Sequence, residues 1–504
     1  MSLRDKSEIG AGLAPARSSR RIVPGERIHI VGAQGAGASA AALLAAWAGA
    51  DVDGCDPGGA SQYTPALDAV GVRVAPAHDA SHVLGPRRPA RMAVTKALTA
   101  VDPDNPELRA ARDAGVPLEP WQQVVADAAH GRLLAAVAGT HGKSTTAGWL
   151  VHTLVGLGAD PGAFVGALLP AAETGIGVAA TARRGAGEAF VVEADEYAGN
   201  FDPYRPGIAV LTSAEWDHPD VFADGDAVIA AFEAWLRRGA EARGPGGRGP
   251  VLVANAADPG VAAVAARLGD WPGRILRTAL DPAPGNVEVA GHVASADPDG
   301  TLLQVAAGSE TRLVRLPTAG RHNAANALGV VGACLAAGYA LEPVLASLAT
   351  FPGVGRRLER KGEAGGVVVY DDYGHHPTAI RETLAAVRQR EPGRRIWAVY
   401  EPLTFHRTAA LLEAFADVLA TADAVAIADI WAGRDPDTSV ASASGLAEAV
   451  ARRNPSIPVA SPGSVEATAR WLADRVRAGE AVLVMGGGRS YRIAELLLEH
   501  LAGR

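Results

Sequence analysis

The sequence is poor in cysteine: its 504 residues include only Cys55 and Cys334. So few cysteines exclude a disulfide framework, and a reducing cytoplasm is the expected location of such a chain. The first 30 residues lack the compact apolar stretch that a signal peptide needs. The longest alanine-rich run, at residues 36–50, is too short and too weakly apolar to cross a bilayer. We therefore expect no membrane insertion.

Lysine is scarce as well, because nearly all of the 47 basic residues are arginine. Against these stand 55 acidic residues, which leave a net charge of −8. An acidic balance of this kind argues against bulk binding of nucleic acid. Apolar residues make up 48% of the chain, enough for sizeable cores, and the length indicates about three domains.

Short apolar strands alternate with helical stretches along most of the chain, which predicts α/β domains with largely parallel sheets. Residues 1–26 are polar and are expected to form a flexible arm. We divide the rest into domains at 27–120, 121–345 and 346–504. The expected strands include 28–31, 72–74, 92–94, 133–138, 190–193, 208–212, 251–254, 367–370, 396–400, 424–428 and 481–485.

The strongest motif is a glycine-rich turn between a buried strand and a helix, with the sequence GTHGKST. Backbone N–H groups of such a turn, together with the helix N-terminus, form an anion site. Lys143 stands where it can reach terminal phosphates, and the Ser144 hydroxyl can bind Mg²⁺. Val137 replaces the first glycine of the strict pattern, so this is a shortened variant. The predicted phosphate site consists of Gly139, Thr140, His141, Gly142, Lys143, Ser144 and Thr145.

Polar side chains stand at two further strand ends and at one helix start. Glu193 is in phase with the strand before it, at the place where P-loop proteins hold the metal beside the phosphates. His218, in the segment EWDHPD, could serve a second metal site. Asn323 and Asn326 are three residues apart on a helix and share a face, which suits adenine or phosphate contacts. The alternatives are solvated loop residues and, for Asn323, a helix cap.

The segment DDYGHHP, at residues 371–377, joins a buried strand to a helix that begins at Pro377. In α/β sheets this crevice at the strand end is the ligand side. A turn does not require two acids, a tyrosine (Tyr373) and two histidines. We therefore predict a ligand site that includes His375. Capping of the helix by the histidines is the alternative.

A second glycine turn near the N-terminus contains Gly32, Gly35 and Gly37. Gln34 interrupts its first G-x-G, so the turn fits a nucleotide diphosphate at a helix start better than it fits a nicotinamide cofactor. An oxidoreductase is therefore disfavoured.

Taken together, five motifs resemble those of the Mur ligase family in order and approximate spacing. They are GTHGKSTT at 139–146, EADE at 193–196, GRHNAANA at 320–327, GVGRRLE at 353–359 and DDYGHHPT at 371–378. The resemblance extends from about residue 27 to the end. It implies an N-terminal Rossmann-like domain for a UDP-sugar, a central P-loop-type ATPase domain and a C-terminal Rossmann-like domain for an amino acid.

The resemblance also implies an activity, a ligase that uses ATP and Mg²⁺ to make a peptidoglycan precursor. ATP would phosphorylate the lactyl carboxylate of UDP-N-acetylmuramate, and the amine of L-alanine would then displace phosphate from the acyl phosphate. Family members that add later amino acids carry a carbamylated lysine in the central domain. The sequence has no lysine between Lys143 and Lys361, which favours the alanine-adding member. The sequence does not fix an oligomeric state.

Residue roles follow from the same resemblance. Catalysis would involve Lys143, Glu193, His218 and His375. Ser144 and Glu193 would hold one Mg²⁺, and His218 a second. ATP would contact the residues of the phosphate turn together with Asn323, Asn326 and Arg357. The UDP-sugar would contact Gly32, Gly35, Gly37 and Asp56. The amino acid would contact Tyr373, His375 and Arg407, with Arg356 or Arg357 as further cations for a phosphate or a carboxylate.

Several positions depart from the usual family pattern: Gln34 replaces a glycine, Cys55 a serine, Thr95-Lys96 a serine pair, and Leu403 a histidine. Two alternatives therefore stay open. One is the relative that attaches a whole tripeptide to the same nucleotide. The other is a nucleotide-binding paralogue without catalytic activity.

Overall fold

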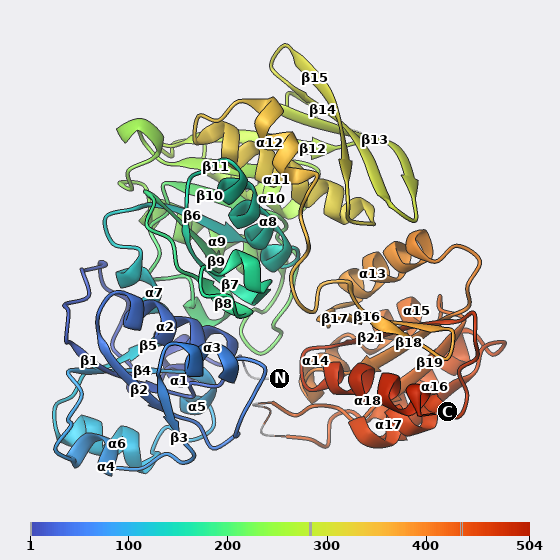
Figure 1. The fold of residues 1–504 in the computed structure, drawn as a ribbon, viewed down its shortest axis with the longest axis horizontal. Helices are drawn as coiled ribbons and strands as arrows, with labels where there is room; N and C mark the ends of the chain where they lie inside the picture. Colours follow the sequence, from blue (N-terminus) through green and yellow to red (C-terminus); the bar gives the residue numbers. More distant parts are fainter. Residues whose placement is uncertain (1–2, 282–284, 434, 436, 504) are drawn as a thin grey trace.

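The computed structural model describes residues 3–281, 285–433, 435 and 437–503 of the chain. It contains three α/β units with one sheet each, which confirms the predicted fold class. In Figure 1 the N-terminal unit is blue, the central unit runs from teal to yellow, and the C-terminal unit is orange to red. Among the described helices, none combines the length and apolarity needed to cross a membrane.

The N-terminal sheet is fully parallel, with the strand order β3-β2-β1-β4-β5. Its strands are β1 (Arg27–Val31), β2 (Asp51–Cys55), β3 (Arg73–Ala75), β4 (Arg91–Val94) and β5 (Leu118–Pro120). The helices of this unit are α1 (Lys6–Ile9), α2 (Ala36–Trp47), α3 (Thr64–Ala69), α4 (Ser81–Leu84), α5 (Lys96–Thr99), α6 (Pro106–Asp113) and α7 (Trp121–Ala128). The strand order reverses between β1 and β4, the point at which doubly wound sheets bind ligands. Helices α2 and α7 cover one face, and α4 and α6 cover the other.

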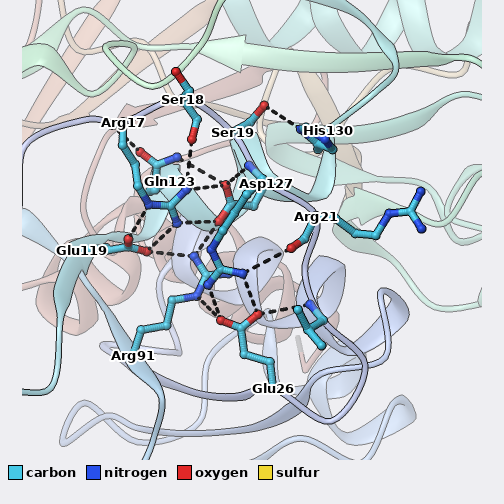
Figure 2. A network of polar contacts seen from close by, with 12 residues as sticks. Arg17, Ser18, Ser19, Arg21, Glu26, Arg91, Glu119, Gln123, Asp127 and His130 are labelled. Atoms are coloured by element: carbon cyan, nitrogen blue, oxygen red, sulfur yellow. Dashed lines mark hydrogen bonds and ion pairs between the residues drawn. The ribbon is translucent and has the colours of Figure 1, made fainter.

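Residues 3–26, which we expected to form a flexible arm, make specific contacts with this unit. The Arg17 guanidinium donates to Glu119 and to Asp127, at 2.8 Å each. Arg91 binds the same two carboxylates from the other side, as Figure 2 shows. Arg91 is 3% exposed and Asp127 is 2% exposed, so these ion pairs are shielded from solvent. We predicted a flexible arm from the polar composition of this segment. Composition does not reveal which ion pairs a fold buries.

The central unit has a ten-stranded sheet with the order β15-β14-β13-β12-β11-β10-β6-β9-β7-β8. Its strands are β6 (Leu133–Ala138), β7 (Gly162–Leu169), β8 (Ala180–Arg183), β9 (Ala189–Ala194), β10 (Ile208–Leu211), β11 (Val251–Asn255), β12 (Arg274–Leu280), β13 (Val289–Asp297), β14 (Gly300–Ala307) and β15 (Glu310–Leu316). Its helices are α8 (Lys143–Gly156), α9 (Gly225–Arg238), α10 (Pro259–Arg267), α11 (Arg321–Ala336) and α12 (Leu341–Leu348). The seven strands from β13 to β7 run parallel, whereas β8, β14 and β15 add antiparallel edges. The phosphate turn therefore lies at the centre of the sheet, after β6.

The C-terminal unit has a six-stranded sheet with the order β16-β17-β21-β18-β19-β20. Its strands are β16 (Glu359–Ala364), β17 (Val367–Asp372), β18 (Ile396–Glu401), β19 (Ala424–Ala428), β20 (Val459–Gly463) and β21 (Ala481–Gly486). Its helices are α13 (Pro377–Arg390), α14 (Phe405–Ala410), α15 (Leu412–Leu419), α16 (Ala443–Arg453), α17 (Val465–Ala473) and α18 (Ser490–Ala502). All neighbouring strands are parallel except β16 and β17. The three sheets lie within the three predicted sequence ranges, although α7 packs on α2 of the first unit. The exact boundaries stay a prediction.

Candidate active site

A cleft of about 1350 Å³ opens where the three units meet. The predicted site residues that line it are Gly35, Gly37, Thr140, His141, Gly142, Lys143, Ser144, Thr145, Glu193, His218, Asn323, Asn326, Arg357, Tyr373, His375 and Arg407. Gly32, Asp56 and Gly139 were predicted as well but do not belong to this lining. The fold therefore brings residues from positions some 370 apart in the sequence into one space.

The phosphate turn packs closely against neighbouring residues. Gly139 and Gly142 have φ angles of 133° and 80°, which favour glycine. A Cβ atom on Gly142 would lie 2.5 Å from the side-chain oxygen of Asn326. Any larger residue would clash there, so the glycines let the backbone pass close to α11. The first residues of α8 line the cleft, and the N–H groups of a helix start can bind an anion.

Lys143 is held by a buried carboxylate that the sequence analysis did not single out. Its Nζ atom lies 3.0 Å from Glu196 Oε2 and donates to the Gly139 carbonyl at 2.5 Å. Burial alone would lower the pKa of Lys143, but the charges of Glu196 and Asp195 raise it above its usual value. Lys143 is therefore a cation. The signal for Glu196 was present in the EADE motif, three residues after Glu193.

Ser144 and Glu193 lie together, as their placement at strand and helix ends suggested. The Ser144 hydroxyl donates to Glu193 Oε1 at 3.0 Å, and the backbone N–H of Gly166 donates to Glu193 Oε2 at 2.6 Å. Arg357, from the C-terminal unit, donates to the Ser144 oxygen at 2.8 Å. This Arg357 contact joins two units directly at the phosphate turn.

His218 gathers with Asp195 and Glu196 rather than with Ser144 and Glu193. One possible ligand atom from each of the three lies within 4.8 Å of the others. His218 has a φ of 56°, an uncommon backbone conformation that proteins tend to retain at functional sites. The two predicted metal positions are thus separate groups of side chains, and the second contains two carboxylates that we had not assigned.

A further group forms where α13 meets the phosphate turn. His141 Nε2 lies 2.8 Å from Glu215 Oε2, and Thr378 donates to Glu215 Oε1 at 2.9 Å. Burial raises the pKa of Glu215, but the hydrogen bond with His141 brings that pKa down to about 2. Glu215 is therefore an anion, and it links the central and C-terminal units.

Arg407, which we expected to bind an amino-acid carboxylate, is paired with a protein carboxylate. Its Nε and Nη2 atoms lie 2.9 Å and 2.8 Å from Asp217 Oδ1, and Nη2 lies 3.1 Å from His218 Nδ1. Asp217 is 5% exposed. Burial would raise the pKa of Asp217, but the charge of Arg407 holds it well below its usual range. Sequence reasoning missed this pair because 190 residues separate its members.

The two adjacent histidines have different surroundings. His375 Nδ1 lies 3.0 Å from the Tyr373 carbonyl oxygen, and its Nε2 lies 4.0 Å from Asp217. Burial and the charge of Arg407 lower the pKa of His375 well below its usual range, so the ring is neutral. His376 instead caps α13 by accepting from the backbone N–H of Thr378 at 3.3 Å. Helix capping, the alternative for both residues, thus applies to His376.

Three family models match successive parts of the chain. They are the Mur ligase family catalytic domain at residues 27–132, the Mur ligase middle domain at 137–334 and the Mur ligase glutamate ligase domain at 356–488. The UDP-N-acetylmuramate–L-alanine ligase of Mycobacterium avium (strain 104) is 38% identical over 481 residues, which cover 92% of this chain and 93% of the relative. The chain belongs to the Mur ligase family.

Solved structures of Mur ligases share the fold. A UDP-N-acetylmuramate–alanine ligase from Thermotoga maritima has a TM-score of 0.74 at 24% identity, over 94% of this chain and 98% of that one. A murein peptide ligase from Psychrobacter arcticus 273-4 has a TM-score of 0.70 at 26% identity, over 95% of this chain and 99% of that one.

In this member of the family, Asn323 and Asn326 share one helix face as predicted. The Asn326 amide donates to Asn323 Oδ1 at 3.2 Å, beside the phosphate turn. Arg356, by contrast, is held inside the C-terminal unit. It lies 3.1 Å from Asp371 and donates to the Gly486 carbonyl at 2.7 Å. Both Arg356 and Arg357 line the cleft, and Arg357 is the one that contacts the phosphate turn.

The glycine turn of this Mur ligase's N-terminal unit is ordered by Gln34. The Gln34 Oε1 atom accepts from the hydroxyls of Ser61 at 3.1 Å and Thr64 at 2.8 Å. Its backbone N–H donates to Asp56 Oδ2 at 2.9 Å. A Cβ atom on Gly37 would lie 2.1 Å from the Trp121 ring, so Gly37 allows α7 to pack against α2. Asp56 thus shapes the turn from outside the cleft.

Proposed function

We propose that this chain joins L-alanine to the lactyl carboxylate of UDP-N-acetylmuramate in an ATP-dependent reaction. The observation that carries the proposal is the contact of Arg357 with Ser144, which brings the C-terminal unit against a phosphate turn inside one cleft. The 38% identity to an L-alanine ligase supports this choice of substrates. The cytoplasm, where ATP and nucleotide sugars are made, is the proposed location.

A carboxylate does not react with an amine at neutral pH, because its oxygen is a poor leaving group. Transfer of the γ-phosphoryl group of ATP to that oxygen forms an acyl phosphate and releases ADP. The alanine amine then attacks the acyl carbon, the carbon–oxygen bond to phosphate breaks with release of inorganic phosphate, and loss of one N–H proton gives the amide. The protein therefore needs cations and N–H donors around the phosphates and a cleft that excludes water.

Lys143 and the start of α8 are the groups we assign to the phosphates. Lys143 is a cation fixed by Glu196 at the mouth of the turn, so little reorganisation is needed when a phosphate arrives. Arg357 reaches the same place from the C-terminal unit. Asn323 and Asn326 lie on the other side of the turn, where we place the nucleotide.

The donor set beside the turn fits Mg²⁺, because Ser144 and Glu193 offer two oxygen atoms 3.0 Å apart. Asp195, Glu196 and His218 would hold a second ion. Bound Mg²⁺ would neutralise charge that develops on the transferred phosphoryl group.

His375 is the residue that we assign to the amino acid. Because its Nδ1 lies against the Tyr373 carbonyl oxygen, Nδ1 carries the proton and Nε2 keeps a lone pair. A neutral ring of this tautomer accepts a hydrogen bond from the alanine amine and orients it. Asp217 contacts both His375 and Arg407. The Nη1 hydrogens of Arg407 can donate to the carboxylate of alanine.

The test is phosphate release by the full-length protein with UDP-N-acetylmuramate, ATP and a panel of acceptors. We expect turnover with L-alanine and far less with glycine, L-serine or a tripeptide. A preference for the tripeptide would overturn the choice of acceptor. That outcome would favour the second candidate function, which the similarity to a murein peptide ligase motivates. Absence of turnover with every acceptor would favour a non-catalytic paralogue.

A further inference from the structure

A second cluster of histidine, cysteine and carboxylate side chains lies inside the N-terminal unit, on the sheet face that α4 and α6 cover. His29 comes from β1, Cys55 from the end of β2, His82 from α4 and Glu107 from the first turn of α6. One possible ligand atom from each lies within 4.8 Å of the others. None of the four lines the cleft, and the proposed ligase reaction uses none of them.

The distances in this cluster are close to those of a four-coordinate zinc site. Glu107 Oε1 lies 2.9 Å from His29 Nε2 and 2.8 Å from His82 Nδ1. Cys55 Sγ lies 3.4 Å from His29 Nε2 and 3.1 Å from Glu107 Oε2. Tetrahedral zinc, with bonds of 2.0–2.3 Å, places its ligand atoms roughly 3.3–3.8 Å apart. A separation of about half an ångström would bring the closest of these pairs into that range.

The charges of the cluster also suit a divalent cation. The Glu107 side chain is fully buried, yet its described partners are the imidazoles of His29, His78 and His82 and the thiol of Cys55. A buried carboxylate needs a compensating charge. One thiolate and one carboxylate together balance the two charges of Zn²⁺, and neutral imidazoles complete the set. The side chains of His78 and His82 are 12% and 21% exposed and give the site a route to solvent.

An outer contact orients one of these ligands. His29 Nδ1 lies 2.7 Å from Asp53 Oδ1, and the parallel register of β1 and β2 pairs the two residues. Metal-binding histidines usually donate their second ring N–H to a carboxylate, which fixes the tautomer. Here the Asp53 contact turns the lone pair of Nε2 toward Cys55 and Glu107.

We propose that His29, Cys55, His82 and Glu107 bind a structural zinc ion, with His78 at its edge, 3.1 Å from Cys55 Sγ. Four protein ligands leave no open position for chemistry, which is typical of structural sites. The ion would fasten the short helix α4 and helix α6 to β1 and β2. Cys55 directly precedes Asp56, which orders the Gln34 turn, so the ion would also support the cleft-facing side of this unit.

Cobalt absorption tests the site on the full-length protein. A thiolate bound to Co²⁺ gives a charge-transfer band, and the chain has only two cysteines. Cys334 is buried in α11, and the described His, Asp and Glu residues form no metal-site group with it. The band therefore reports Cys55. We expect it in the wild-type protein with excess Mg²⁺ present to occupy the cleft, and we expect Cys55→Ser to abolish it.

Zinc content provides the second measurement, by mass spectrometry after dialysis against Mg²⁺ buffer. We expect about one zinc per wild-type chain and far less in Cys55→Ser and His82→Ala. His292→Gln is the matched control, because His292 is an exposed histidine on β13 paired with Asp281. Its zinc content should equal that of the wild type.

A variant outside the four ligands tests the site even if the ligand variants misfold. The Asp53 side chain is 42% exposed, so Asp53→Ala should fold, and it should weaken zinc binding by about 10–100-fold. The proposal is overturned if wild-type protein shows no thiolate–cobalt band, or if Cys55→Ser retains as much zinc as the wild type. In either case the cluster is a metal-free network around Glu107. These outcomes leave the proposed ligase activity untouched, since that activity is measured separately.

Discussion

Two glycine-rich turns in this chain share one local plan but differ in chemistry. Each follows a buried parallel strand, β1 or β6, and each begins a helix, α2 or α8. Around the central turn, charged side chains converge from other strands and from another unit: Lys143, Glu193, Glu196 and Arg357. Around the N-terminal turn, the side-chain contacts of Gln34 are neutral and come from Ser61 and Thr64, and a carboxylate, Asp56, binds the Gln34 backbone N–H.

In both turns, glycine occurs where the backbone packs closely against another side chain. Gly142 makes room for Asn326, and Gly37 makes room for Trp121. Glycine spacing alone thus does not separate a phosphate-transfer site from a binding turn. The charges that neighbouring strands bring to the turn make that distinction.

Lys143→Ala should reduce ligase activity by roughly 100-fold or more, because a cation that stabilises the transferred phosphoryl group is lost. The fold should survive, since burial already raises the pKa of Glu196 and that residue can take up a proton when its partner is removed. Steady-state rates beside a melting curve check both points. Lys6→Ala is the control, because Lys6 is an exposed lysine on α1. Retention of more than about a tenth of the activity would contradict the role of Lys143.

Glu193→Gln keeps the size of the side chain and removes its charge. If Glu193 holds Mg²⁺ with Ser144, the variant should need about tenfold more Mg²⁺ for half-maximal activity, since ligand charge sets affinity for such ions. A Mg²⁺ titration of the rate measures this. Glu173→Gln, which alters a glutamate paired with His152, should leave the titration unchanged. An unchanged titration for Glu193→Gln would make this residue an ordinary strand-end acid.

Much of the core was predictable because strands buried on both faces are continuous apolar runs. The predicted strands at 133–138 and 424–428 coincide with β6 and β19. The strands β13, β14 and β15, at one end of the central sheet, were not predicted. Their burial changes from residue to residue, and many of their side chains are polar and exposed, so no apolar run marks them.

The site was predictable to the extent that it depends on strand ends. Lys143 and Ser144 follow β6, and Glu193 lies near the end of the neighbouring parallel strand β9, which places all three at one end of the sheet. The Asp217–Arg407 pair depends on how two units sit against each other, which no local pattern contains. The metal-type cluster around Glu107 was missed for a similar reason, because its members come from four separate elements.

The adjacent residues His375 and His376 provide a third test. It separates a role in substrate binding from a role in helix capping. His375→Ala should raise the KM for L-alanine by about tenfold while the KM for ATP stays close to the wild-type value, because one hydrogen bond to the amine is lost. His376→Ala should instead lower the stability by about 0.5–2 kcal/mol, since it removes the cap of α13. Kinetics and melting curves of both variants, measured side by side, separate the roles. A lower melting temperature with unchanged KM values for His375→Ala would contradict its assignment.

The smallest effect is expected at the N-terminal turn. Gln34→Ala removes the acceptor for Ser61 and Thr64, and each lost hydrogen bond is worth about 1 kcal/mol. The KM for UDP-N-acetylmuramate should therefore rise by about fivefold or less, and the KM for ATP should not change, because Gln34 belongs to a different unit from the phosphate turn. Gln304→Ala, at an exposed position on β14, serves as the control. If the UDP-sugar KM of Gln34→Ala equals that of the wild type, the glycines and helix α2 suffice for binding, and the side chains around this turn matter less than those around Lys143. A rise in both KM values would instead mean that the two turns are coupled through the cleft, which would break the contrast drawn between them.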